Sequence, residues 1–129
     1  MKSEAIDVVV IDDDERVLRA LQRLLRAAGF SPTGYSSAED FLKNQTEQQA
    51  DCLVLDIQLG GMSGLDLHKE LTAQGKAPPI VFITAHDEPE IRKKTQEAGC
   101  AGFFHKPLPG SALLEAVRNA VSASRQRAE

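Results

Sequence analysis

The sequence predicts an α/β fold in which helices cover a parallel β-sheet. Short apolar runs typical of buried strands alternate five times with segments of helical character, which is the pattern of repeated βα units rather than of hairpins. Three of these runs lead into charged residues, which are Asp12-Asp13, Asp56 and Lys106. Parallel strands would bring these groups together at the carboxyl edge of the sheet, where open α/β sheets carry their active crevice.

The first strand is predicted at Val8-Val9-Val10-Ile11, and the helix after it ends at Gly29, a residue typical of helix C-termini. Residues 30–35 read as a weak strand, because Pro32 and Gly34 disfavour a central position. We therefore expect this strand at an edge of the sheet.

A short helix is predicted next, with Ser36 or Ser37 as its cap, and the third strand follows at 52–55. Apolar spacing predicts a further helix over 63–73, which Gly75 ends.

Pro78-Pro79 introduces the fourth strand at 80–83. Asp87 has a glutamate three residues later and a proline in the first turn, so we expect it to cap a helix over 88–98 that stops at Gly99. This helix carries few apolar residues and should be the least firmly held.

The last strand ends near Phe104, and the last helix is predicted over about 111–123. The residues after it are polar. These boundaries predict one domain at 1–122 and a polar tail at 123–129 that resembles the start of a linker.

The chain has 129 residues, a size typical of one domain, and a net charge of −4. This charge argues against direct nucleic-acid binding by the domain. No apolar run is long enough to span a membrane, and no signal-like stretch opens the chain. We expect Cys52 and Cys100 to be buried, reduced thiols and the protein to be cytoplasmic.

The charged groups at the predicted edge suit a metal and phosphoryl site. Asp12, Asp13 and Asp56 together with Lys106 carry a formal charge of −2, which one divalent cation would neutralise. Oxygen ligands next to a substrate phosphate favour Mg²⁺. Each group alone has an ordinary interpretation, such as a helix cap for an aspartate or a strand cap for Thr84. Their common position at one edge favours the functional interpretation.

These residues resemble the receiver domain of two-component response regulators. The likeness rests on five motifs and their spacing, namely Val8-Val9-Val10-Ile11-Asp12-Asp13, Leu55-Asp56, Met62-Ser63-Gly64, Ile83-Thr84-Ala85 and Gly102-Phe103-Phe104-His105-Lys106-Pro107. The resemblance implies a flavodoxin-like, doubly wound sheet of five parallel strands in the order 2-1-3-4-5, with helices on both faces.

The resemblance also implies a role for each acidic residue. Asp56 would accept a phosphoryl group from a sensor histidine kinase. Asp13 would bind Mg²⁺ directly, Asp12 mainly through water, and the main-chain carbonyl of Gln58 would be a further ligand. On this basis the protein is a signalling domain that catalyses only its own phosphorylation and dephosphorylation.

The remaining motif residues resemble the switch of this family. Lys106 would pair with the phosphoryl oxygens and Thr84 would hydrogen-bond to one of them. Phe103 matches the aromatic switch position, although a core phenylalanine is the alternative. The peptide bond between Lys106 and Pro107 resembles the family's cis bond.

Two features adjust this interpretation. Gly60-Gly61 stands where many receivers have proline, so we expect a more flexible loop and a less rigidly aimed Gln58 carbonyl. Gln58 and His86 are predicted to flank the path of an attacking water and so to tune the lifetime of the phosphoryl group.

Two other classes of protein fit these residues less well than the receiver domain does. A haloacid-dehalogenase-like phosphatase needs a second acid two residues past the nucleophile, where this chain has Gln58. A pure interaction domain that has lost phosphorylation is a second alternative. It is disfavoured because all the residues that phosphorylation requires in this family are present. Within the family, the chain is most similar to regulators with a LuxR-type helix-turn-helix output, although a single-domain regulator is the alternative. We expect a homodimer through the fourth helix, fifth strand and fifth helix on phosphorylation.

Overall fold

The computed structural model describes residues 5–44, 50–75, 77–86 and 88–128. The strands are β1 Asp7–Ile11, β2 Ser31–Tyr35, β3 Cys52–Asp56, β4 Ile80–Thr84 and β5 Gly102–His105. They form one parallel sheet in the order β2-β1-β3-β4-β5, which confirms the predicted fold class and places the strand with Pro32 and Gly34 at an edge.

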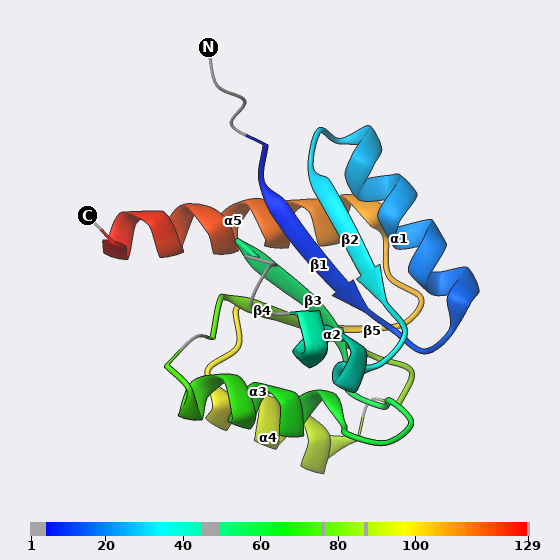
Figure 1. The fold of residues 1–129 in the computed structure, drawn as a ribbon, viewed down its shortest axis with the longest axis vertical. Helices are drawn as coiled ribbons and strands as arrows, with labels where there is room; N and C mark the ends of the chain where they lie inside the picture. Colours follow the sequence, from blue (N-terminus) through cyan, green and yellow to red (C-terminus); the bar gives the residue numbers. More distant parts are fainter. Residues whose placement is uncertain (1–4, 45–49, 76, 87, 129) are drawn as a thin grey trace.

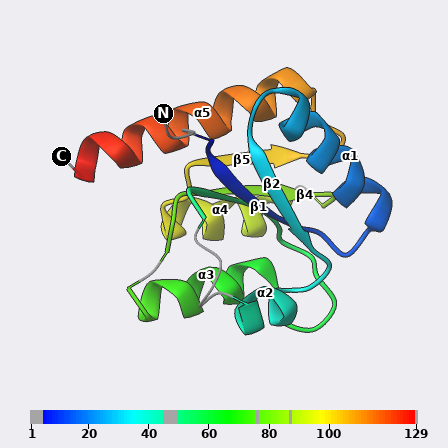
Figure 2. The same cartoon turned by 45° about the horizontal axis from the view of Figure 1, so that its top comes forward.

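Five helices connect the strands and lie on both faces of the sheet (Figure 1). They are α1 Glu15–Ala27, α2 Ala38–Asn44, α3 Gly64–Ala73, α4 Pro89–Ala98 and α5 Gly110–Ala128. Figure 2 shows α1 and α5 on one side of the sheet and α2, α3 and α4 on the other. The molecule is therefore a three-layer α/β sandwich.

The central strands are buried on both faces, and their side chains alternate between two cores. Val8, Val10 and Val54 belong to the core beneath α1 and α5. Val9 and Leu53 belong to the core beneath α2, α3 and α4. This double burial explains why these strands read as continuous apolar runs.

Local signals fix most of the helix ends. Asp14 caps α1, because its carboxylate accepts hydrogen bonds from the backbone amides of the first turn. Ser37 rather than Ser36 makes the capping bond of α2, from the backbone N–H of Asp40. Gly29 follows α1 with a φ of +96°, which only glycine adopts without strain.

The fourth helix is thin in core contacts, as its composition predicts. Among its described residues only Thr95 is fully buried, and its hydroxyl donates to the carbonyl of Arg92. Asp87, the predicted cap, lies outside the described residues. Glu88 holds the N-cap position, and its side chain makes no capping bond. Gly99 ends the helix in the left-handed conformation.

The last helix is longer than the predicted range of 111–123, since α5 continues to Ala128. The residues after 121 are polar but include no glycine or proline, so nothing in them stops a helix. Figure 1 shows the end of α5 reaching beyond the sheet, where polar side chains suit solvent. The described part of the predicted tail, as far as Ala128, is therefore helical. No helix in the described part of the chain is long and apolar enough to cross a membrane.

Candidate functional site

Four strands deliver the predicted site residues to the carboxyl edge of the sheet. Asp12 directly follows β1, and Asp56 is the last residue of β3. Thr84 ends β4 and accepts, through its main-chain carbonyl, a 2.7 Å hydrogen bond from the backbone N–H of Lys106 after β5. The parallel register therefore brings together groups that lie far apart in the sequence.

Three carboxylates converge at this edge. Oxygen atoms of Asp12, Asp13 and Asp56 all lie within 4.8 Å of one another. Asp12 is fully buried, Asp56 is 4% exposed, and Asp13 is exposed. The cluster is thus buried on the side of Asp12 and Asp56 and open to solvent on the side of Asp13.

Lys106 is the cation of this cluster. Its Nζ donates to Oδ2 of Asp12 at 2.8 Å and to Oδ2 of Asp56 at 3.0 Å. Burial alone would lower the pKa of Lys106, but the bonds to the two carboxylates outweigh it and the pKa is raised. Lys106 is therefore firmly protonated at neutral pH. The Lys106–Pro107 peptide bond is cis.

Asp56 is held at both carboxylate oxygens. Oδ1 accepts a 3.0 Å hydrogen bond from the backbone N–H of Gln58, while Oδ2 faces Lys106. Burial raises the pKa of Asp56, the bond from Lys106 opposes that effect, and the nearby charge of Asp12 adds to it. The net pKa is raised, because one ammonium does not compensate two buried carboxylates.

The donor set suits a hard divalent cation. All three acidic residues offer oxygen atoms, the ligands that Mg²⁺ prefers. Asp12 is already engaged, since Oδ1 accepts from the backbone N–H of Asp14 and Oδ2 from Lys106. Asp13 is the most accessible of the three, which fits direct binding by Asp13 and a water-mediated role for Asp12.

Thr84 is fully buried and sits in a small hydrogen-bond network. Its Oγ1 donates to Oε1 of Gln58 at 2.8 Å and accepts from the backbone N–H of His86 at 3.0 Å. Gln58 and His86, which are predicted to flank the path of an attacking water, therefore both contact Thr84. The sequence does not reveal this connection.

Phe103 is half-buried and pairs in register with Phe82, on the sheet face that α4 covers. The guanidinium carbon of Arg92 in α4 lies 5.5 Å from the centroid of its ring. Thr84 follows Phe82 by two residues in β4, so alternation places its side chain on the same face. Phe103 thus serves as a core residue and also joins β5 to α4.

Two carboxylates hold the loop that contains Gly60-Gly61. The backbone N–H of Gly60 donates to Oδ2 of Asp13 at 3.3 Å, and that of Met62 donates to Oε2 of Glu39 at 2.9 Å. The loop is therefore tied down in spite of its glycines. Sequence reasoning missed Glu39, because its partner is 23 residues away and no local pattern marks it.

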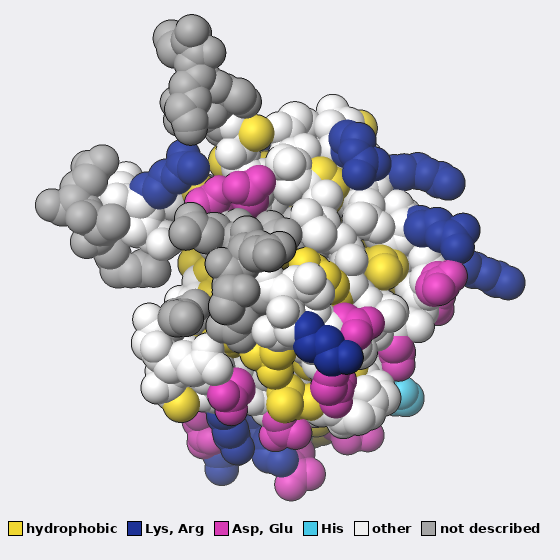
Figure 3. Space-filling model, viewed as in Figure 1, with side chains coloured by type: hydrophobic (Ala, Val, Ile, Leu, Met, Phe, Trp, Pro, Cys, Tyr) yellow, Lys and Arg dark blue, Asp and Glu magenta, His cyan; other side chains and the backbone are white. Residues whose placement is uncertain are grey.

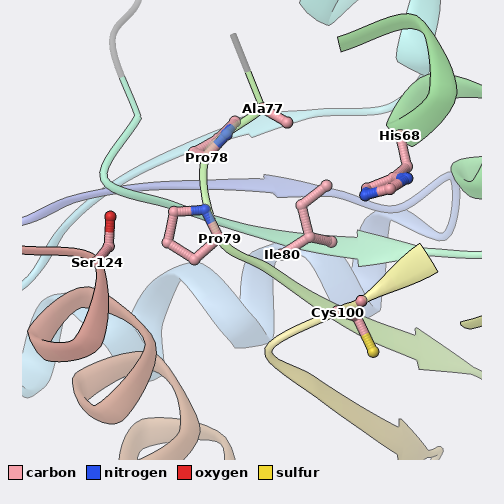
Figure 4. Close-up of a pocket in the computed structure, with 8 residues that line it drawn as sticks. His68, Ala77, Pro78, Pro79, Ile80, Cys100 and Ser124 are labelled. Carbon is pink, nitrogen blue, oxygen red and sulfur yellow. The ribbon is translucent and has the colours of Figure 1, made fainter. Parts of the chain in front are cut away.

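A separate cavity of about 230 Å³ lies at the opposite, amino edge of β4 (Figure 4). Among its lining residues are His68, Pro79, Cys100 and Ser124. Burial lowers the pKa of His68 and raises that of Cys100, so both are neutral near pH 7. The cavity shares no residue with the acidic cluster.

Figure 3 shows lysine and arginine side chains gathered over α1. The exposed arginines of this helix are Arg16, Arg19, Arg23 and Arg26. Arg19 forms an exposed ion pair with Glu15 one turn earlier, which contributes little to stability. Helix α1 begins at Glu15, directly after the loop that carries Asp12 and Asp13. The basic face is therefore adjacent in sequence to the acidic cluster.

Comparison with known proteins agrees with this geometry. Residues 8–118 match the family described as the response regulator receiver domain. The chain is 37% identical over 127 residues to the response regulator protein TodT of Pseudomonas putida, covering 98% of this chain and 56% of TodT. It is 34% identical over 124 residues to the transcriptional regulatory protein FixJ of Azorhizobium caulinodans, covering 96% of this chain and 59% of FixJ.

Among solved structures, the response regulator StyR is 40% identical and superposes with a TM-score of 0.85, covering 96% of this chain and 64% of StyR. The fold and the acidic edge define a signalling phosphoacceptor domain of two-component systems rather than a classical enzyme. The chain belongs to the response regulator receiver domain family. It spans a little over half the length of the curated relatives TodT and FixJ.

Proposed function

We propose that Asp56 accepts a phosphoryl group from the phosphohistidine of a sensor histidine kinase in a Mg²⁺-dependent reaction. One observation carries this proposal: Lys106 Nζ joins Asp12 and Asp56 at a carboxylate cluster that is open on the side of Asp13. A buried acceptor, an accessible metal ligand and a fixed cation are the components that phosphoryl transfer requires.

The transfer exchanges one bond of phosphorus for another. A carboxylate oxygen of Asp56 forms a P–O bond as the P–N bond to the donor histidine breaks, and the electron pair of that bond returns to the imidazole, whose other ring nitrogen carries a proton. Neither step needs an added oxidant or reductant. The product is an aspartyl phosphate and a neutral kinase histidine.

The surrounding residues bind and orient the transferred group. Asp13 would hold Mg²⁺ directly, Asp12 through water, and Gln58 through its main-chain carbonyl, and the metal supplies charge neutralisation when bound. Lys106 would bind a phosphoryl oxygen, because its ammonium already lies 3.0 Å from Asp56. Thr84 would donate its hydroxyl to another oxygen.

The reorientation of the Thr84 hydroxyl toward the phosphoryl group would provide the conformational switch of the domain. To reach the phosphoryl group, the hydroxyl has to leave Oε1 of Gln58. Space on that sheet face then becomes available to Phe103, whose ring contacts Arg92 of α4. We propose that the change creates a dimer surface on α4, β5 and α5.

The relatives suggest the biological setting. TodT is described as a response regulator and FixJ as a transcriptional regulatory protein. We propose that the chain acts in the cytoplasm as the receiver of a transcriptional regulator with a LuxR-type output domain, joined through residues 123–129. A single-domain regulator is the alternative, and in neither case does this domain itself bind nucleic acid.

Mass spectrometry tests the phosphoacceptor role. The purified protein is incubated with Mg²⁺ and a small phosphodonor, and intact mass is recorded over time. A single phosphoryl addition that Asp56→Asn abolishes is expected. Catalytic consumption of the donor would indicate a phosphatase, and no addition would indicate an interaction domain.

A further inference from the structure

The loop between β3 and α3, residues 57–63, is anchored by a side chain from a helix that takes no part in the acidic cluster. Oε2 of Glu39 in α2 accepts a 2.9 Å hydrogen bond from the backbone N–H of Met62. This bond lowers the pKa of Glu39, as expected for a carboxylate that binds an amide. Glu39 is therefore a charged acceptor for the loop backbone.

Gly61 is shaped by the same contact. Its φ is +79°, and a Cβ at this position would lie 2.6 Å from Oε2 of Glu39. A Cβ on Gly60 would have no atom within 4 Å. The two glycines thus differ. A side chain at Gly61 would displace the carboxylate of Glu39, whereas a side chain at Gly60 would enter open space.

The other anchors of the loop are tied to the site itself. The backbone N–H of Gly60 donates to Asp13, at the long distance of 3.3 Å. Asp13 is a ligand in the proposed function, so a bound cation would compete with this N–H for the carboxylate. The Glu39 bond does not involve the cluster and would persist when metal binds.

From this geometry we propose that Glu39 is a positioning residue that fixes the Gly60-Gly61 loop and, through it, the main-chain carbonyl of Gln58. The inference rests on the proposed function, in which this carbonyl is a metal ligand. In a chain without proline in the loop, a hydrogen bond from α2 supplies the missing restraint.

Mg²⁺ affinity measured by isothermal titration calorimetry tests the role. Glu39→Ala should weaken binding about 3- to 10-fold, somewhat less than the loss of a partner that touches a ligand side chain. Glu39→Gln keeps an acceptor for Met62 but removes the charge, so its affinity should stay close to that of the wild type. Loss of affinity in Glu39→Gln equal to that in Glu39→Ala would indicate a field effect and overturn the proposal.

Asp40→Asn is the matched control, since it removes one acidic charge from the same turn of α2 and should leave affinity unchanged. A second readout needs no metal. Amide hydrogen exchange in residues 58–62 should be about tenfold faster in Glu39→Ala than in the wild type, because the Met62 amide loses its acceptor. Unchanged exchange would contradict the anchor.

The glycine pair gives an independent test. Gly61→Ala should weaken Mg²⁺ binding and Gly60→Ala should not, and Gly61→Ala should cost less in a Glu39→Ala background, where the clash is absent and only the strain of the positive φ remains. An equal loss of Mg²⁺ affinity on Gly61→Ala in the wild-type and Glu39→Ala backgrounds would overturn the coupling between Gly61 and Glu39. Wild-type protein that bound no Mg²⁺ would overturn both proposals, whereas wild-type binding left intact by Glu39→Ala would overturn the positioning role alone.

Discussion

Thr84 donates its hydroxyl hydrogen to Oε1 of Gln58 across 2.8 Å, a bond that joins the end of β4 to the residue two positions after Asp56. The hydroxyl proposed to bind the phosphoryl group is thus already engaged. Switching exchanges one hydrogen bond for another with a charged acceptor, which is the stronger of the two. We therefore expect Gln58 to influence both the access of water and the freedom of Thr84.

The first prediction concerns the lifetime of the phosphoryl group. Replacing both Gln58 and His86 with alanine should shorten it severalfold, because the side chain of Gln58, which accepts from Thr84, and that of His86, two residues past Thr84, would no longer obstruct water. The half-life is measured by intact mass after the phosphodonor is removed. Gln74→Ala, at the exposed end of α3, is the control. An equal or longer half-life would show that these side chains do not limit hydrolysis.

The second prediction concerns Asp56→Asn, which should abolish phosphoryl labelling and raise the melting temperature of the metal-free protein. The pKa of Asp56 is raised by burial, so this group favours folding below its ordinary pKa and loses that effect as pH rises through the folded-state pKa. Above the folded-state pKa the ionised form opposes folding, and the uncharged amide removes this cost.

Labelling is followed by mass spectrometry and stability by thermal unfolding without Mg²⁺. Asp66→Asn, an exposed substitution in the first turn of α3, should label normally. A lower melting temperature in Asp56→Asn would argue against a crowded acidic site.

The third prediction concerns Lys106→Met. The variant leaves Asp12 and Asp56 without their cation, and we expect a loss of about 3 kcal/mol at pH 7, as for other broken buried ion pairs. The loss should shrink at pH 5, because the pKa of Asp56 is raised by burial and its protonation relieves the repulsion, and added Mg²⁺ should restore part of the stability at pH 7.

Urea unfolding at both pH values measures the effect, with the exposed Lys69→Met as control. An equal loss at pH 7 and pH 5 would indicate lost packing of the side-chain stem rather than lost charge. In the wild type, the raised pKa of Lys106 means that its stabilising effect persists at neutral pH and disappears only in strong alkali.

The strands and the acidic edge could be predicted because their signals are local. A buried parallel strand has to be apolar on both faces, so a charged residue at its end stands out, as Asp56 does after Leu55. The edge position of β2 could be predicted in the same way, because Pro32 and Gly34 disfavour a central strand. Predicting these features does not require knowing which residues lie on the neighbouring strands or helices.

The contacts that hold the site could not be predicted in the same way. The bonds from Thr84 to Gln58 and from Met62 to Glu39 join segments 26 and 23 residues apart, and neither leaves a pattern in the sequence. The end of α5 was missed for another reason. Its last turns reach beyond the sheet, so a helix there lacks the apolar spacing by which helices are recognised.

The last prediction concerns the output surface. The phosphoryl group adds a charge of about −1.5 to −2, and new bonds from Thr84 and Lys106 should contribute roughly 1.5–3 kcal/mol each. Inverting a 1:99 population takes about 5.5 kcal/mol, and the two bonds supply part of it, because each replaces a hydrogen bond that Thr84 or Lys106 already makes. The element most easily shifted is α4, which buries only Thr95 fully and meets β5 where Arg92 covers Phe103.

We therefore expect activation by beryllofluoride and Mg²⁺ to produce a homodimer through α4, β5 and α5. Arg92, Lys93 and Lys94 would face Glu90 or Glu97 of the second copy, so the dimer should weaken as salt is raised. Sedimentation with and without the activator measures this, and Asp56→Asn, which should stay monomeric, is the control. An activated protein that stays monomeric at high micromolar concentration, with unchanged amide exchange in residues 84–106, would show that no such switch operates.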